Sequence, residues 1–118
     1  MQKPKRDEIT RKLEKISKYL PEKNVDAALH FVDYLRNMPG TNGIQWRSLR
    51  NLLCLSQVEM GVLLGYSLQP QGEHDSWRCS GLHRVERDGF ARMPSVSVLE
   101  GLRIIERTLC RGDNDHNN

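Results

Sequence analysis

The chain has 118 residues, of which 37% are hydrophobic and 28% are charged. This is the length of one ordinary domain with a modest core, and the composition argues against both a membrane protein and a wholly disordered one. The 18 basic and 15 acidic residues give a formal net charge of +3, which favours polyanionic partners only slightly.

The sequence predicts a protein that is neither exported nor embedded in a membrane. No apolar run reaches the roughly 18 residues of a membrane span, and the charged start from Met1 to Arg6 lacks the apolar stretch of a secretory signal. The three cysteines, Cys54, Cys79 and Cys110, form no paired motif, and their odd count suits reduced thiols. We therefore expect a soluble cytoplasmic protein.

Two helices are predicted before residue 40. From Lys5 to Leu20 apolar residues recur at steps of four, three and four, which is one stripe on a helix that Pro21 ends. A second helical pattern covers Glu22 to Asn37, and its stripe is broad enough to face a core or a partner subunit. Met38 to Gly43 is rich in residues that favour turns. Residues 1–40 are thus predicted to form an N-terminal helical hairpin for dimerisation or partner contact.

Two short helices joined by a tight turn fit the sequence after this linker. Ile44, Leu49 and Leu52 lie on one face of the first. The hydroxyl of Ser56 can accept a hydrogen bond from a main-chain N–H two or three residues on, so Ser56 is predicted to cap the second helix. Gly65 suits the left-handed position that closes it.

Loop and helix alternate in the rest of the chain. A loop is expected from Tyr66 to Asp75, because Pro70 to Gly72 interrupts any helix. Helices are expected from Asp75 or Ser76 to about Arg87 and from Pro94 to Arg111, before a disordered tail at 112–118. With strand signals nearly absent, we predict an all-α fold of five or six helices.

Two stretches of the chain resemble the lambda-repressor-like, or xenobiotic-response-element (XRE), helix-turn-helix family. They are LRNLLCLSQVEMGVLLG at 49–65 and LHRVERDG at 82–89, the latter followed by Pro94. The resemblance implies a helix-turn-helix DNA-binding domain over residues 41–111, with its second helix against the DNA backbone and its third in the major groove. It further implies that Gln57 contacts a phosphate and that Gly61 lets these two helices cross closely.

The connection after Gly65 is longer than the family's pattern, which affects the assignment of base-reading residues. Among the groove-facing positions, Arg84 is the best candidate, since a guanidinium can bond guanine O6 and N7 together. The inserted Leu68 to Asp75 loop either serves as a wing, although Glu73 and Asp75 would repel phosphates, or points away from DNA. The groove-facing positions are Arg78, Cys79, Ser80, His83 and Arg84, and the full set of candidate DNA-binding residues adds Arg50, Ser56 and Gln57.

A metal site is one alternative use of these residues. His74, Cys79 and His83, with Cys110 or His116 as a fourth ligand, could suggest zinc. Their spacing is not that of a known zinc module, and facing solvent or DNA explains Cys79 and His83 without a metal. We expect no metal and no cofactor.

Other conspicuous side chains have structural interpretations. Ser56 is expected to be a cap and not a nucleophile, because nothing nearby supplies the base and orienting acid of a catalytic serine. Cys54 and Cys110 are expected to be small buried hydrophobes. Trp46 and Trp77 are each expected at the start of a helix, where an aromatic ring commonly packs.

The function predicted from these patterns is a sequence-specific DNA-binding transcriptional regulator, a dimeric repressor of its own or a neighbouring promoter, and not an enzyme. Two half-sites add their energies where one recognition helix buries too little surface. The dimer seam is expected on the N-terminal hairpin or on the helix from Pro94 to Arg111. One alternative is an antitoxin-like or phage-type adaptor that holds another protein with the hairpin. Another is a helical interaction module without DNA binding.

Overall fold

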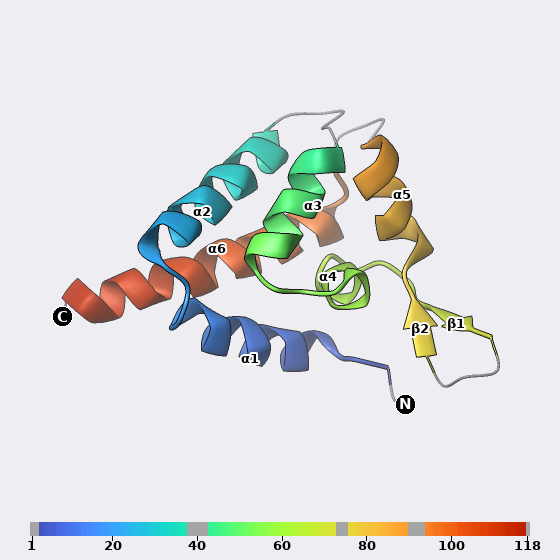
Figure 1. Cartoon of the computed structure of the whole chain (residues 1–118), viewed down its shortest axis with the longest axis horizontal. Coiled ribbons are helices and arrows are strands. Elements are labelled where there is room, and N and C mark those ends of the chain that lie inside the picture. The colour runs from blue at the N-terminus through green and yellow to red at the C-terminus, as the bar shows by residue number, and fades with distance from the viewer. Residues whose placement is uncertain (1–2, 38–42, 73–75, 90–93, 118) are drawn as a thin grey trace.

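Figure 1 shows the computed structural model of the chain, which describes residues 3–37, 43–72, 76–89 and 94–117, with side chains up to Cys110 in the last range. The described residues form six helices and one two-stranded sheet, and the predicted linker at 38–42 lies outside them. The prediction of a mostly helical chain is confirmed, whereas the sheet was not predicted. In chain order the elements are α1 (Arg6–Ser17), α2 (Glu22–Asn37), α3 (Gly43–Leu52), α4 (Gln57–Leu63), β1 (Gln69–Gln71), β2 (Ser76–Arg78), α5 (Ser80–Asp88) and α6 (Val96–Asn117).

The two N-terminal helices belong to the central core. Each buries one apolar stripe, as their periodicity predicts, with Ile9 and Leu13 buried on α1. α1 packs on α4 and α6, and α2 packs on α3 and α6 (Figure 1). α1 and α2 therefore share one core with the other described helices. One apolar cluster joins all six helices, and its largest fully buried members are Trp46, Ile9, Leu13, Leu35, Leu49, Leu53, Met60, Leu63, Leu64, Leu82, Leu102 and Ile105.

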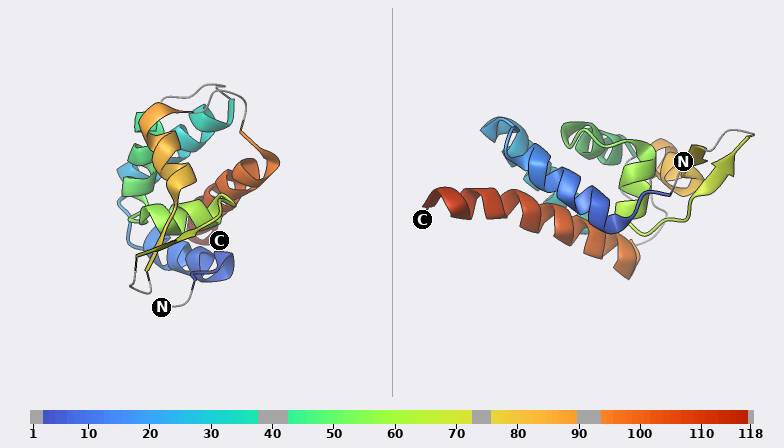
Figure 2. Two further views of the ribbon diagram at one scale, coloured as in Figure 1. Left: turned by 90° about the vertical axis from the view of Figure 1, so that its right-hand side faces the viewer. Right: turned by 90° about the horizontal axis from the view of Figure 1, so that it is seen from below.

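α6 is the longest helix and lies across both α1 and α2 (Figure 2). Its backbone stays helical to Asn117, so the predicted helix end at Arg111 and the predicted tail at 112–118 differ from the structure. Gly112 costs helix only about 1 kcal/mol relative to alanine, which is too little to end a long helix by itself. None of the helices in the described ranges is long and apolar enough to cross a lipid bilayer.

A β-hairpin replaces part of the predicted loop and the first turn of the predicted helix. β1 and β2 pair antiparallel, with Gln69 opposite Arg78 and Pro70 opposite Trp77. Since this ladder uses the main-chain groups of 76–78, α5 begins only at Ser80. Trp77 therefore lies in a strand and not at a helix start, whereas Trp46 is fully buried in α3 as expected.

The turn between α3 and α4 holds Cys54 in a left-handed conformation. Its φ is 56°, its N–H donates to the Asn51 carbonyl, and the N–H of Leu55 donates to the Arg50 carbonyl. These bonds and the buried Leu55 form a Schellman-type helix end, where glycine is the usual residue. Cys54 is exposed, so the expectation that it is a buried hydrophobe is wrong, and Cys110 is only half-buried.

Replacing Cys54 with glycine should raise the free energy of unfolding by about 0.5–1 kcal/mol. A left-handed conformation costs a residue with a Cβ about 1–2 kcal/mol, and the greater freedom of glycine in the unfolded chain offsets part of this gain. Urea denaturation would measure the change. The Cys54→Ala variant is the control, because alanine keeps the Cβ, and equal stability of the alanine and glycine variants would contradict the prediction.

Candidate functional site

α4 begins with a complete capping box, which confirms the predicted role of Ser56. The Ser56 hydroxyl accepts from the N–H of Glu59 at 3.1 Å, and the Glu59 carboxylate accepts from the N–H of Ser56 at 2.9 Å. Burial acts to raise the pKa of Glu59, but hydrogen bonds from Lys12 and Ser56 outweigh it and lower that pKa. The start of α4 is thereby fixed.

α1 holds α4 at both of its ends. Lys12 places its Nζ 2.8 Å from each Glu59 carboxylate oxygen at the start of α4. Arg6 donates from Nη2 to the Leu63 carbonyl at 2.8 Å, at the end of α4. These long-range contacts were not predicted, because no local pattern pairs a charge on α1 with a group 47 or 57 positions later. They make α1 part of the support of the site.

The centre of the site is the side chain of Glu86 on α5, which is fully buried. Arg50 of α3 binds it in a two-point ion pair, with Nε 2.6 Å from Oε2 and Nη2 3.0 Å from Oε1. Gln57, the first residue of α4, donates from Nε2 to the same Oε1 at 3.1 Å. One carboxylate thus joins α3, α4 and α5 through charge-assisted hydrogen bonds.

This arrangement removes Arg50 from the candidate DNA contacts. Its side chain is only 16% exposed, and its remaining nitrogen, Nη1, donates to the Leu55 carbonyl at 3.0 Å. Arg50 is therefore a structural residue, because its guanidinium is used inside the protein. Gln57 also turns its amide nitrogen inward, although it lies at the surface beside His83, with Nε2 3.5 Å from Nδ1.

Cys79 is not a groove-facing residue. It lies just before α5, is 2% exposed and packs on Gly61 of α4. A Cβ built on Gly61 would lie 2.4 Å from the Cys79 Sγ, so the prediction that Gly61 permits a close approach is confirmed. Burial raises the pKa of the Cys79 thiol. Cys79 lies two helical turns before Glu86 and one turn before Leu82, so it falls on the buried side of α5 and not on the side of His83 and Arg84.

The exposed face of α5 carries a polar stripe at positions 80, 83, 84 and 87. This spacing places the four residues on one side of the helix. His83 and Arg84 are exposed, as expected for groove-facing residues. Arg87 was not predicted to contribute, but it lies on the same stripe and pairs with neighbouring Asp88 at 2.8 Å. The Ser80 hydroxyl is engaged by Gln69 of the hairpin at 2.6 Å.

Arg78 is exposed but lies outside α5, at the base of the hairpin. The eight sequence candidates therefore separate into four groups. Ser80, His83 and Arg84 share the exposed face of α5, Ser56 and Gln57 lie at the start of α4, Arg78 lies on β2, and Arg50 and Cys79 are internal.

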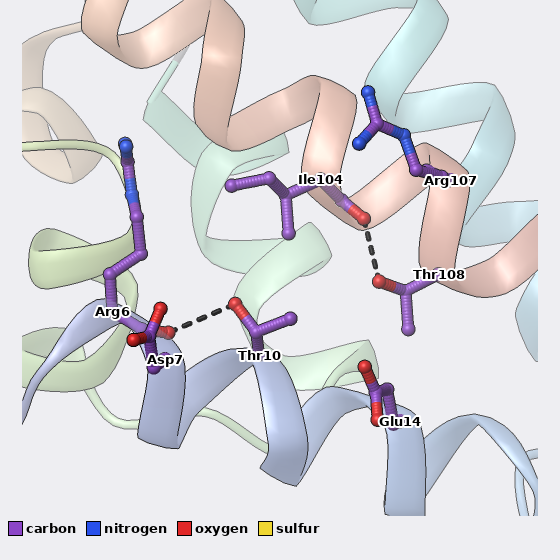
Figure 3. Close-up of a pocket in the computed structure, with 7 residues that line it drawn as sticks. All are labelled: Arg6, Asp7, Thr10, Glu14, Ile104, Arg107 and Thr108. Carbon is purple, nitrogen blue, oxygen red and sulfur yellow. Dashed lines mark hydrogen bonds between the residues drawn. The ribbon is translucent and has the colours of Figure 1, made fainter.

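A separate pocket of about 180 Å³ lies between α1 and α6 (Figure 3). Its hydroxyls are both directed at main-chain carbonyls, since Thr10 donates to Arg6 at 2.9 Å and Thr108 donates to Ile104 at 2.7 Å. Such bonds are ordinary in helices and do not prepare a nucleophile. The lining residues are Arg6, Asp7, Thr10, Glu14, Ile104, Arg107 and Thr108.

The metal hypothesis and the family resemblance find no further support. Within the described residues no three His, Cys, Asp or Glu side chains gather as metal ligands, and His74 and the His116 side chain lie outside them. Comparison with family models, with curated proteins and with solved structures gives no match to this chain. The helix-turn-helix interpretation therefore depends on the sequence pattern and on this geometry.

Proposed function

We propose that the chain is a sequence-specific DNA-binding regulator in which α4 and α5 act as a lambda-repressor-like helix-turn-helix. In this proposal α5 lies in the major groove of double-stranded DNA and α4 lies against its backbone. The observation that carries the proposal is the buried Glu86 carboxylate, which joins both helices to α3 while the opposite face of α5 stays exposed and polar.

The fixed geometry of α5 favours reading of bases. A reading helix must present its side chains in a defined orientation, because a bidentate contact to a base tolerates little displacement. Glu86 anchors α5 from inside, and the close packing of Cys79 on Gly61 sets its distance from α4. His83 and Arg84, three and two positions before Glu86 and on the outer side of α5, are held by this anchor.

The chemistry of the exposed stripe also fits DNA. His83, Arg84 and Arg87 are hydrogen-bond donors, and Arg84 can donate to both O6 and N7 of guanine. The stripe itself holds no carboxylate, and Asp88 beside it is neutralised by Arg87. A helix face of this kind is attracted by phosphates and can discriminate base edges.

We further propose that the protein acts as a dimeric repressor. One recognition helix contacts only a few base pairs, and two related half-sites supply the specificity that a promoter requires. Among the described residues of the two predicted seams, the exposed large apolar side chains are Tyr19, just after α1, and Val96, at the start of α6. Duplexes selected by a dimer should contain two copies of one motif related by two-fold symmetry.

The test is selection of duplexes from a random DNA library by the purified full-length protein, followed by binding titrations. Replacing Arg84 with alanine should weaken binding to the selected duplex by about 1–3 kcal/mol and relax preference at one base pair. Binding to a scrambled duplex should change little, because the lost contact reads a base.

Arg84→Lys is the matched control for this experiment. Lysine keeps the charge but lacks the planar fork that bonds O6 and N7 together, so it should relax base preference like alanine. Equal loss of affinity by Arg84→Ala on the selected and scrambled duplexes would show that Arg84 only positions the protein. Enrichment of no sequence at all by the wild-type protein would reject sequence-specific DNA binding.

A further inference from the structure

The hairpin is attached to the start of α5 by side-chain hydrogen bonds. Cys79, the residue before α5, offers no side-chain cap. Gln69 of β1 takes this place, because its Oε1 accepts from the Ser80 N–H at 3.1 Å and from the Ser80 hydroxyl at 2.6 Å. Since Gln69 lies opposite Arg78 in the strand register, the base of the hairpin is fixed to the helix.

The two faces of the hairpin differ in chemistry. Side chains alternate across a strand, and directly paired residues share a face. The register therefore places Pro70 and Trp77 on one face and only hydrogen-bonding side chains on the other. The polar face consists of Gln69, Gln71, Ser76 and Arg78, of which Gln71 and Arg78 are exposed.

The apolar face is only partly covered by the N-terminal segment of the chain, since Trp77 is half-buried and Pro70 is exposed. The Lys3 Nζ lies 4.8 Å from the centroid of the Trp77 ring, at the distance of a cation–π contact. The polar face is the one that continues into the start of α5, since it carries the Gln69 cap.

We propose that the polar face of the hairpin is a second DNA contact, in which Arg78 binds the sugar-phosphate backbone beside the groove that α5 enters. This inference rests on the proposed function. α5 and the hairpin lie on the same side of the molecule (Figure 2, left), and Arg78 precedes the helix by two positions. The contact lies at the base of the hairpin, and the acidic residues Glu73 and Asp75 lie outside the described residues.

The experiment measures binding at several salt concentrations. Fluorescence anisotropy would follow the full-length protein on its selected duplex and on a mixed-sequence duplex of about 30 base pairs, from about 50 to 200 mM KCl. Arg78→Ala should reduce the slope of log K against log salt by about one on both duplexes, because one phosphate contact is lost. At about 100 mM salt its affinity should fall about five- to tenfold on each, with base preference unchanged.

Lys23→Ala is the matched control, since it removes an exposed cation from the first turn of α2, at the opposite end of the long axis (Figure 1). It should keep the wild-type slope. Suppose that the wild-type protein binds DNA. If Arg78→Ala then has the same salt slope as Lys23→Ala, or if it alters base preference at one position, the hairpin contact is rejected. The proposed function of α5 would stand in either case. If the wild-type protein binds neither duplex, both proposals fail.

Discussion

Replacing Glu86 with alanine should lower the free energy of unfolding by about 3 kcal/mol or more, which is the largest effect that we expect from a single side chain. Without the carboxylate, the guanidinium of Arg50 stays largely buried with its charge unpaired. The Gln57 amide loses its partner as well. Urea denaturation of the purified variant would measure the loss, and an effect below about 1 kcal/mol would contradict this role of Glu86.

Two further variants test whether the loss of stability comes from the Arg50–Glu86 ion pair itself and not from the removal of a charge alone. Arg47 also approaches Glu86, at 3.8 Å, but it is 54% exposed, so Arg47→Ala should change stability by less than about 0.5 kcal/mol. The double variant Arg50→Met with Glu86→Leu should recover most of the loss, because apolar residues of similar size avoid the cost of burying charge. Its DNA binding would show whether the ion pair also orients α5.

Replacing Gly43 with alanine should cost about 3 kcal/mol, because the added methyl group would collide with main chain. A Cβ at Gly43 would lie 2.2 Å from the Glu86 carbonyl oxygen and 2.5 Å from that of Val85. Backbone atoms cannot rotate away, so α3 and α5 would have to separate, at the upper end of the usual cost of overpacking. Thermal and urea denaturation would measure the loss.

Gly61→Ala is the comparison for Gly43→Ala. Its new Cβ meets the side chain of Cys79, with Sγ at 2.4 Å, and a side chain can yield more than a backbone. The cost should therefore be smaller, and Cys79→Ala in the same chain should recover part of it by removing the sulfur. A larger loss for Gly61→Ala than for Gly43→Ala would contradict the close approach of α3 and α5.

Features set by nearby residues could be predicted from the sequence. α2 has the predicted bounds from Glu22 to Asn37, because its periodicity and flanking turn residues act within a few positions. Ser56 caps α4 and Gly65 has a φ of 86°, since both depend on the chemistry of one turn. Gly61 was correctly expected to allow a close crossing, although from the family pattern and not from periodicity.

Features set by distant residues could not be predicted from the sequence. The start of α5 depends on the pairing of 76–78 with 69–71, which takes up residues that the sequence pattern had assigned to the helix. The internal use of Arg50 depends on Glu86 thirty-six positions away, which no local rule detects. Of the groove-facing candidates, His83 and Arg84 kept their expected exposure because both lie within the part of α5 that the pattern had located.

The path of α6 across α1 and α2 has a consequence for biosynthesis. Part of the buried faces of α1 and α2 is covered by α6, which follows them by about sixty residues or more, so the core cannot close while the ribosome is still producing residues near 100. Pairing of chain ends requires closure of a long loop, which slows folding compared with contacts between neighbours. The nascent chain therefore keeps part of the apolar stripes of α1 and α2 exposed until α6 has been made, and exposed apolar surface of this kind is prone to aggregation.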